Sequence, residues 1–399
     1  MKTTLPNNHH PMKKSRIPKS SLAALLLLAT LPQLAHAATG TWNVDANGLW
    51  SLNTNWLSDI IADGSGFTAN FTNDITADRT VSLDSARTLT SLVFSDSATA
   101  TPGSWILDNN ATPANTLTGI STITVNALGT GATANISAVI AGTGTAITKS
   151  GTGTLVLSGA NTFTKTDSNN TTFAMRLTQG TVVIASDSAF GVTTGTGFNA
   201  TTLINLNGAT LQASGSARTV ANPIWLNGST TVVSGSQSLT FSGAAMGRGN
   251  NATVTNNITG GGTLSFTGKV YTDQTTGSKI LTFNGTGNTL ISGVIANNTG
   301  NFAGQNGSII KSGTGTLTLS NTASTYTGAT QILASVMEVA VFFCHPFVTR
   351  FSSSRPAAMM LNCNFVFEIG MKKQKQPQTK TTANKNHQKH SPSSAKKLT

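Results

Sequence analysis

A short motif that occurs twice is the feature that most constrains how this chain can fold. It reads Ile-Thr-Lys-Ser-Gly-Thr-Gly-Thr-Leu-Val-Leu-Ser from residue 147, and Ile-Lys-Ser-Gly-Thr-Gly-Thr-Leu-Thr-Leu-Ser from residue 310. An Asn, an aromatic residue and a Thr follow each copy, so the clearest repeats span residues 147–164 and 310–328. Recurrence of one strand-forming unit is typical of solenoids, in which similar units stack along an axis. The motif therefore favours repetitive β structure over an enzyme built around one site.

A wider similarity surrounds the two copies. Ile-Ser-x-Val-Ile precedes the first copy at residues 136–140 and the second at residues 291–295. The motif lysines, Lys149 and Lys311, stand 162 positions apart (311 minus 149), which is far longer than one solenoid coil. We therefore expect the copies to mark equivalent corners several coils apart, with Gly-Thr-Gly-Thr acting as a tight backbone turn.

Short segments of alternating apolar and polar residues fill the chain between residues 38 and 336. This period of two places one side chain inside and the next outside a strand, and Gly, Asn or Ser bounds nearly every segment. The clearest segments are residues 81–83, 89–94, 122–125, 155–157, 182–184, 203–206, 209–211, 231–233, 239–241, 264–266, 280–283 and 317–319.

The fold class predicted from this pattern is all-β, and a β-solenoid is favoured over a sandwich or a barrel. The strand segments are of one kind, their spacing is irregular, and nothing marks a closed set of strands. With about 20–25 residues per coil, the body would form roughly 12–15 coils. At roughly 4.8 Å per coil, the rod would be on the order of 60 Å long.

The net charge of +12 is unevenly distributed along the chain. Lys and Arg against Asp and Glu leave +5 in residues 1–37, −1 in residues 38–336 and +8 in residues 337–399. Because the body is nearly neutral and carries no basic stripe, we expect no nucleic-acid binding through it. The basic tail could instead contact anionic surfaces.

Residues 1–37 have the layout of a secretory signal peptide. Basic residues at positions 13, 14, 16 and 19 precede an apolar run at residues 22–31, and Ala-His-Ala ends at residue 37. A membrane anchor is the alternative, but the run is shorter than the ~20 residues that a span needs. Met12 is an alternative start to Met1.

Three tryptophans, Trp42, Trp50 and Trp56, open the body among Asn and Gly residues. They could form a platform that stacks on carbohydrate. The alternative, which we favour, is a hydrophobic cap over the first open edge of the solenoid, because uncovered strand edges promote aggregation.

The repeats at residues 147–164 and 310–328 resemble the autotransporter-associated β-strand repeat of bacterial passenger domains and large surface proteins. Residues 42–50 and 75–81 also resemble the N-terminal region of such proteins, and the likeness in style extends to residue 333. The resemblance implies a right-handed parallel β-helix (β-solenoid) that is exported and extended. It carries over no catalytic residue and no cofactor.

Residues 337–399 do not continue the repeat. An apolar segment with Cys344 and His345 replaces it, and from about residue 372 the chain is rich in Lys, Gln, Thr, Asn and Ser, a composition typical of disorder. We interpret the switch as a shifted reading frame or a truncation of a larger surface protein; a genuine basic tail is the alternative.

Residue types needed for common catalytic sites are missing between residues 38 and 336, which contain no His, Cys or Glu. A nucleophile therefore lacks its usual base, and a zinc site lacks its usual ligands. Paired carboxylates would have to be aspartates. Asp74, Asp78 and Asp84 are the candidate calcium ligands, although Asp is also a common turn residue.

We therefore expect a non-catalytic, adhesin-like passenger protein without cofactors, whose partners are polysaccharide or other cell-surface ligands. It would be exported to the cell surface, the extracellular space or the periplasm of a Gram-negative-type bacterium. A polysaccharide-processing β-helix lyase or hydrolase is the alternative, since such enzymes share this shape. The oligomeric state does not follow from the sequence.

Overall fold

The computed structural model describes residues 1–2, 37–144, 146–168, 172–193, 195–227, 230–248, 251–272, 279–297, 306–333, 337–339 and 349–351. The predicted signal peptide, apart from residues 1, 2 and 37, lies outside the described residues. So does most of the predicted tail, including the part from about residue 372.

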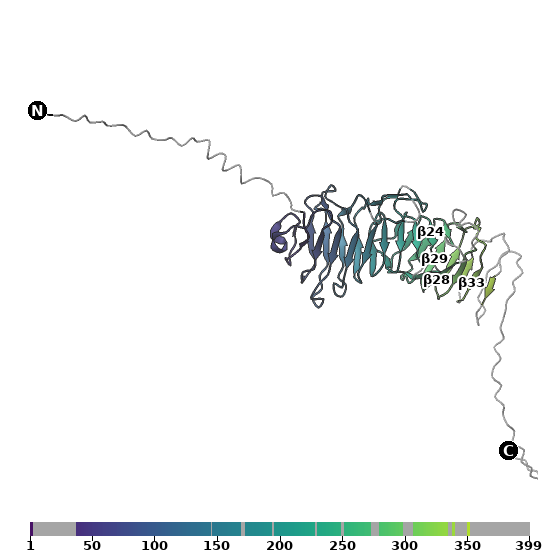
Figure 1. Cartoon of the computed structure of the whole chain (residues 1–399). Helices are drawn as coiled ribbons and strands as arrows, with labels where there is room; N and C mark the ends of the chain where they lie inside the picture. The colour runs from purple at the N-terminus through teal and green to yellow at the C-terminus, as the bar shows by residue number, and fades with distance from the viewer. Residues whose placement is uncertain are drawn as a thin grey trace, which may run out of the picture.

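The chain forms a parallel β-solenoid of about 10 turns, which confirms the predicted fold class. Figure 1 shows an elongated rod whose colour changes steadily along its axis, so that chain order and position along the rod coincide. From β18 through β32 the strands visit three sheets in strict rotation. Every strand pairing among the described residues is parallel, as expected when each coil returns to the same face one step further on.

Sheets 1 and 2 run along most of the rod. Among the described residues, sheet 1 contains, in spatial order, β1 (Gly40–Thr41), β3 (Thr68–Phe71), β6 (Ser91–Phe94), β9 (Thr122–Val125), β13 (Ile147–Ser150), β16 (Met175–Leu177), β18 (Ile204–Leu206), β21 (Ile224–Leu226), β24 (Ala245–Gly247), β27 (Val270–Tyr271) and β30 (Ile295–Ala296). Sheet 2 contains β2 (Gly48–Leu49), β4 (Arg79–Ser82), β7 (Trp105–Asp108), β10 (Ala134–Ile136), β14 (Thr154–Leu157), β17 (Thr181–Ile184), β19 (Thr210–Ala213), β22 (Thr230–Ser234), β25 (Ala252–Asn256), β28 (Ile280–Asn284), β31 (Ser308–Lys311), β33 (Thr330–Ile332) and β35 (Thr349–Phe351).

The third side of the rod is formed by shorter sheets. Sheet 3 contains β20 (Arg218–Val220), β23 (Leu239–Phe241), β26 (Thr263–Phe266), β29 (Asn288–Ile291), β32 (Leu317–Leu319) and β34 (Met337–Val339). Two smaller sheets contain β5 (Arg87–Thr88), β8 (Thr116–Thr118) and β11 (Val139–Ile140), and β12 (Thr143–Gly144) and β15 (Thr164–Lys165).

Coils are longer than predicted. In sheet 2, register partners in neighbouring strands are separated by as few as 19 positions, from Thr330 to Thr349, and by as many as 33, from Gly48 to Val81. The predicted 12–15 coils were therefore too many, since the structure has about 10 turns. Each predicted strand segment overlaps an observed strand, but the corner loops between them are longer than the prediction assumed.

The core is a set of apolar columns that run along the inside of the rod. In sheet 2, Val81 pairs with Leu107, which pairs with Ile136, then Leu157 and then Ile184. All five side chains are buried, because the alternation of the sequence keeps the same inward positions in register from coil to coil. Stacked side chains thus supply the burial that no single coil could achieve alone.

An aromatic cap closes the first end of the rod, which confirms the predicted role of the three tryptophans. Trp42, Trp50 and Trp56 are at most 2% exposed, and the ring of Trp56 lies 5.4 Å from that of Trp42 and 4.9 Å from that of Trp50. Each indole N–H donates to a backbone carbonyl. Two 3-10 turns, η2 (Asn53–Asn55) and η3 (Leu57–Asp59), carry the chain across this end.

Two strands lie beyond residue 336, where we predicted the solenoid to end. β34 pairs in parallel with β32, and β35 pairs in parallel with β33. Strand pairing therefore continues past the predicted boundary into residues that lack the repeat motif. Among the described residues, no helix is long and apolar enough to cross a membrane.

Replacing Trp56 by Ala should destabilise the first coils by about 3–5 kcal/mol, because a large buried side chain is lost from the cap. The measurement is the urea midpoint of unfolding followed by far-UV circular dichroism. Leu57→Ala is the matched control: Leu57 is 51% exposed, so its loss should change stability by less than about 0.5 kcal/mol. Equal midpoints for the two variants would contradict the cap.

Candidate interaction surface

The lysine of the first repeat closes a corner of the rod from the inside. Lys149 is fully buried at the end of β13, and its Nζ donates to the carbonyl oxygens of Ser150 at 2.9 Å, Gly151 at 2.9 Å and Gln179 at 3.0 Å. Gln179 belongs to the next coil, so the ammonium joins two stacked corners. Burial lowers the pKa of Lys149 to about 8 from its usual 10.5.

Glycine is required in this corner for two reasons. Gly151 has a φ of 76°, in the left-handed region that other residues rarely adopt. A Cβ there would also lie 2.2 Å from the carbonyl oxygen of Val125 in the preceding coil. The Gly-Thr-Gly-Thr segment is therefore a tight turn, as predicted.

The second repeat has the same local chemistry at a different corner. Lys311 is 3% exposed, and its Nζ donates to Ser312 O at 2.5 Å and Gly313 O at 2.8 Å. Lys311 is the last residue of β31 in sheet 2, however, whereas Lys149 is the penultimate residue of β13 in sheet 1. The prediction of equivalent corners was therefore wrong. The bonds to the two residues that follow the lysine are common to both copies, so the same local arrangement serves two different corners of the rod.

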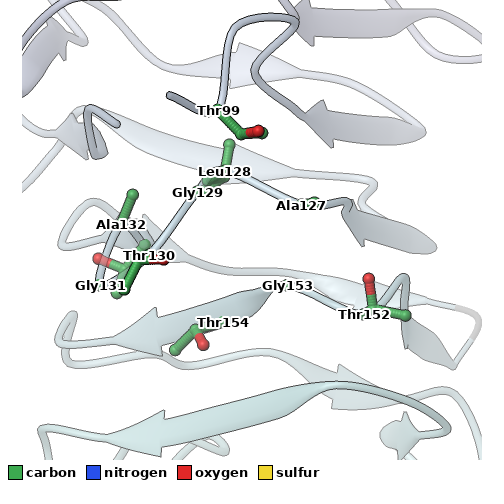
Figure 2. A pocket seen from close by; sticks show the side chains of 11 residues that line it. Thr99, Ala127, Leu128, Gly129, Thr130, Gly131, Ala132, Thr152, Gly153 and Thr154 are labelled. Carbon is green, nitrogen blue, oxygen red and sulfur yellow. The ribbon is translucent and has the colours of Figure 1, made fainter. Parts of the chain in front are cut away.

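A groove of about 420 Å³ lies beside the first repeat corner. Three chain segments line it: Thr99, the loop at residues 127–133, and Thr152, Gly153 and Thr154 of the motif. Figure 2 shows Thr130, Thr152 and Thr154 on two neighbouring corners, with Thr99 on the far side of Leu128. Hydroxyl groups, backbone groups and small apolar side chains make this wall, which carries no charged residue. Such a lining suits a neutral, hydrogen-bonding ligand.

The outer faces of the sheets carry columns of hydroxyl side chains. On sheet 2, Thr154 pairs with Thr181, which pairs with Thr210. Further along the same sheet, Thr230, Thr253 and Thr282 form a second column. All except Thr230, which is exposed, are half-buried. The rod thus presents similar hydrogen-bonding groups at the regular spacing of its coils, roughly 4.8 Å.

The outer face of sheet 1 changes character halfway along the rod. One outward column begins with Thr68, Ser91, Thr122 and Thr148 and then continues with Arg176, Asn205, Trp225, Met246 and Tyr271. Leu203, Trp225 and Met246 form a small apolar cluster there, with Phe173, Phe198 and Tyr271 packed against it. Part of the connection at residues 195–203 packs on this face through Phe198 and Leu203, and Thr196 O accepts from Ala244 N at 2.9 Å.

This outer cluster was missed in the sequence. In the structure, the three residues of each of the strands β18, β21 and β24 are all buried, so burial does not alternate there. Unbroken burial indicates a strand covered on both faces. The Ile-Trp-Leu segment of β21 could have revealed it.

The candidate calcium ligands do not form a cluster. Asp78 accepts a hydrogen bond from Ser104 N at 2.8 Å, Asp84 pairs with Arg87 at 3.2 Å, and Asp74 is exposed. Within the described ranges, no three His, Cys, Asp or Glu side chains are placed to hold a metal ion. The contacts of Asp78 and Asp84 are those of turn and coil-joining residues, so the geometry lends no support to a calcium site.

Replacing Lys149 by Met should destabilise the solenoid by about 2 kcal/mol, because buried carbonyl groups lose their hydrogen-bond donor. The thermal midpoint of the full chain gives the measurement. Lys279→Met is the control, since Lys279 lies half-buried ahead of β28. A Lys149→Met variant as stable as the wild type would show that the ammonium does not hold the corner.

The lowered pKa of Lys149 predicts a specific dependence of stability on pH. With a folded pKa of about 8 and a usual value of 10.5, the folded chain binds fewer protons than the unfolded chain between these values. The free energy of unfolding contributed by Lys149 should therefore rise from pH 8 to pH 10.5 and be constant below pH 8. Urea titrations of wild type and Lys149→Met across this range give the free energy of unfolding of each. The difference, wild type minus variant, should increase from pH 8 to pH 10.5, and a constant difference would contradict the prediction.

Comparison with known proteins agrees with the repeat geometry. Residues 147–184 and 309–334 match the family model of the passenger-associated-transport-repeat. No curated protein and no solved structure matches the chain significantly. The matched segments contain both lysine corners and the strands that follow them, and the repeat implies an exported, surface-associated protein. The chain is thus a β-solenoid protein with two segments that are similar to the passenger-associated-transport-repeat.

Proposed function

We propose that this chain is a non-catalytic adhesin-like protein of the bacterial cell surface, whose rod binds polysaccharide through many weak contacts. The observation that carries the proposal is the set of in-register hydroxyl columns, such as Thr154, Thr181 and Thr210, which continue from coil to coil. A polysaccharide chain also repeats its hydroxyl groups along one direction, so a rod of this kind can meet it at several points.

Weak contacts become effective when they are linked. One hydrogen bond contributes only about 0.5–1.5 kcal/mol net, but several sites on one rigid body raise the overall affinity by a factor of roughly 10²–10⁴. The groove beside the first repeat, lined by Thr130, Thr152 and Thr154 among others, adds a more enclosed contact to the columns. The buried lysines are engaged in closing corners, which supports a structural role for the repeat.

The test uses three isosteric substitutions, Thr154→Val, Thr181→Val and Thr210→Val, combined in the full chain. Val suits a half-buried strand position as well as Thr does, so the fold should persist while binding to insoluble cell-surface polysaccharide weakens by about tenfold or more. Cosedimentation gives the affinity, and circular dichroism checks the fold. Unchanged binding would contradict the proposed role of the columns.

Absence of catalysis is tested in the same mixtures. The polysaccharide should release no soluble sugar and no unsaturated product during incubation with the chain and calcium. Product formation that Asp74→Ala or Asp78→Ala abolishes would replace the proposal with a polysaccharide-processing enzyme.

A further inference from the structure

We propose that the outer face of sheet 1 carries a site for an acidic polysaccharide, formed by Phe173, Arg176, Trp225, Arg248, Lys269 and Tyr271. We call these six residues the aromatic–basic strip. The inference rests on the proposed function, because it names the ligand class of one face of the proposed polysaccharide-binding rod.

The strip pairs each cation with an aromatic ring. The Arg176 guanidinium carbon lies 6.0 Å from the Phe173 ring centroid, that of Arg248 lies 3.6 Å from Trp225, and Lys269 Nζ lies 4.9 Å from Tyr271. A cation–π contact positions a basic side chain beside an aromatic ring and leaves its positive charge in place. In such a pair the aromatic ring can contact a sugar ring, and the neighbouring cation can bind a carboxylate carried by that sugar.

Charge is distributed along the rod in a way that favours an anionic ligand at this face. Eight of the eleven Asp residues in the body precede residue 110, and the strip lies beyond that point. Among the described residues, the outward column from Arg176 to Tyr271 contains no carboxylate. Arginine can bind a carboxylate through two parallel hydrogen bonds, which gives orientation as well as affinity.

Two buried polar atoms beneath the strip are complementary to a hydroxyl group. Trp225 is 1% exposed and Asn205 is 3% exposed, and Trp225 Nε1 and Asn205 Oδ1 have no hydrogen-bond partner within the described part of the chain. One is a donor and the other an acceptor, and the two residues are register partners on β21 and β18. A sugar hydroxyl can accept from the first and donate to the second. Arg248 covers one face of the Trp225 ring, and Phe173 packs against the same ring edge-on. Drawing the Arg248 guanidinium toward a ligand carboxylate would uncover the face that it covers.

The size and stiffness of the strip favour a polysaccharide over other anionic polymers or a membrane. Arg176 on β16 and Tyr271 on β27 are four strand steps apart along the sheet-1 order, or roughly 19 Å. This length suits several sugar rings lying along the rod axis. Three cations are few for a nucleic acid, whose binding depends on neutralising many phosphates. The strip also lacks the cluster of basic residues that holds a protein on anionic lipid.

The experiment measures binding of the full chain to polygalacturonate and to its methyl-esterified form, which keeps the rings and hydroxyl groups but removes the charge. Wild type should bind polygalacturonate at least tenfold more tightly. Arg176→Gln and Lys269→Gln should each weaken that binding by about tenfold, and their effects should add because the sites are well separated. Arg218→Gln is the matched control, since Arg218 lies on β20 of sheet 3.

A second readout locates the ligand on this face. Trp225 is far from the other four tryptophans in the sequence, so polygalacturonate should change its fluorescence, and Trp225→Phe should abolish the change. Thermal midpoints of all variants show whether each remains folded.

The outcomes separate this inference from the proposed function. Polysaccharide binding that is equal for the charged and esterified forms, and insensitive to Arg176→Gln and Lys269→Gln, overturns the strip and leaves the proposed function standing. A chain that binds neither polymer, nor insoluble cell-surface polysaccharide, contradicts both. Tighter binding to phosphatidylglycerol vesicles or to single-stranded DNA than to polygalacturonate, lost in the same two variants, would assign the strip to a membrane or to nucleic acid instead.

Discussion

Parallel pairing of each coil with the next is the constraint on which the rest of this structure depends. Register partners such as Leu107 and Ile136 repeat the same inward position in successive coils, so a slip by one residue would turn an apolar column outward. Alternation of apolar and polar residues inside most strands protects this register, and the differences in length between coils fall in the loops. That is why coil length can change from 19 to 33 positions while the strands remain in register.

Corners are the second problem that a solenoid must solve, because a sharp turn beside a packed core leaves backbone carbonyls without partners. Lys149 and Lys311 solve it with a buried ammonium that accepts no hydrogen bond and donates several. Gly151 and Gly313 have φ values of 76° and 72°, so both copies build the same turn. The part of the repeat that both copies share therefore builds a corner of the solenoid. The same lysine–glycine turn follows a strand of sheet 1 in the first copy and a strand of sheet 2 in the second, so it is not tied to one sheet.

How much of this could be predicted from the sequence depends on the range of the interaction. Alternation is local, so the strands near Leu155 and Val182 were evident, and so was the role of Trp50 in a cap of neighbouring tryptophans. Coil number and the corner occupied by Lys311 depend on the summed lengths of many loops, which no local pattern reports. The outer cluster around Trp225 and Met246 required knowledge of which distant residues become register partners. The hydroxyl columns and the aromatic–basic strip are, for the same reason, visible only after the coils are stacked.

The two faces of a strand carry different constraints, and this explains how one rod can bear unlike surfaces. Inward positions of sheet 1, such as Leu177, Leu206 and Leu226, stay apolar through consecutive coils, because each must pack on the one before it. Their outward neighbours have no such requirement, so the same column can pass from Thr148 to Arg176 and then to Trp225 without disturbing the core. Since side chains of a strand alternate, an outward residue can differ from coil to coil while the inward column stays apolar. A solenoid can therefore acquire a binding surface on one stretch of one face while the remainder keeps its hydroxyl columns, and the position of such a surface is marked by the point at which the outward column changes.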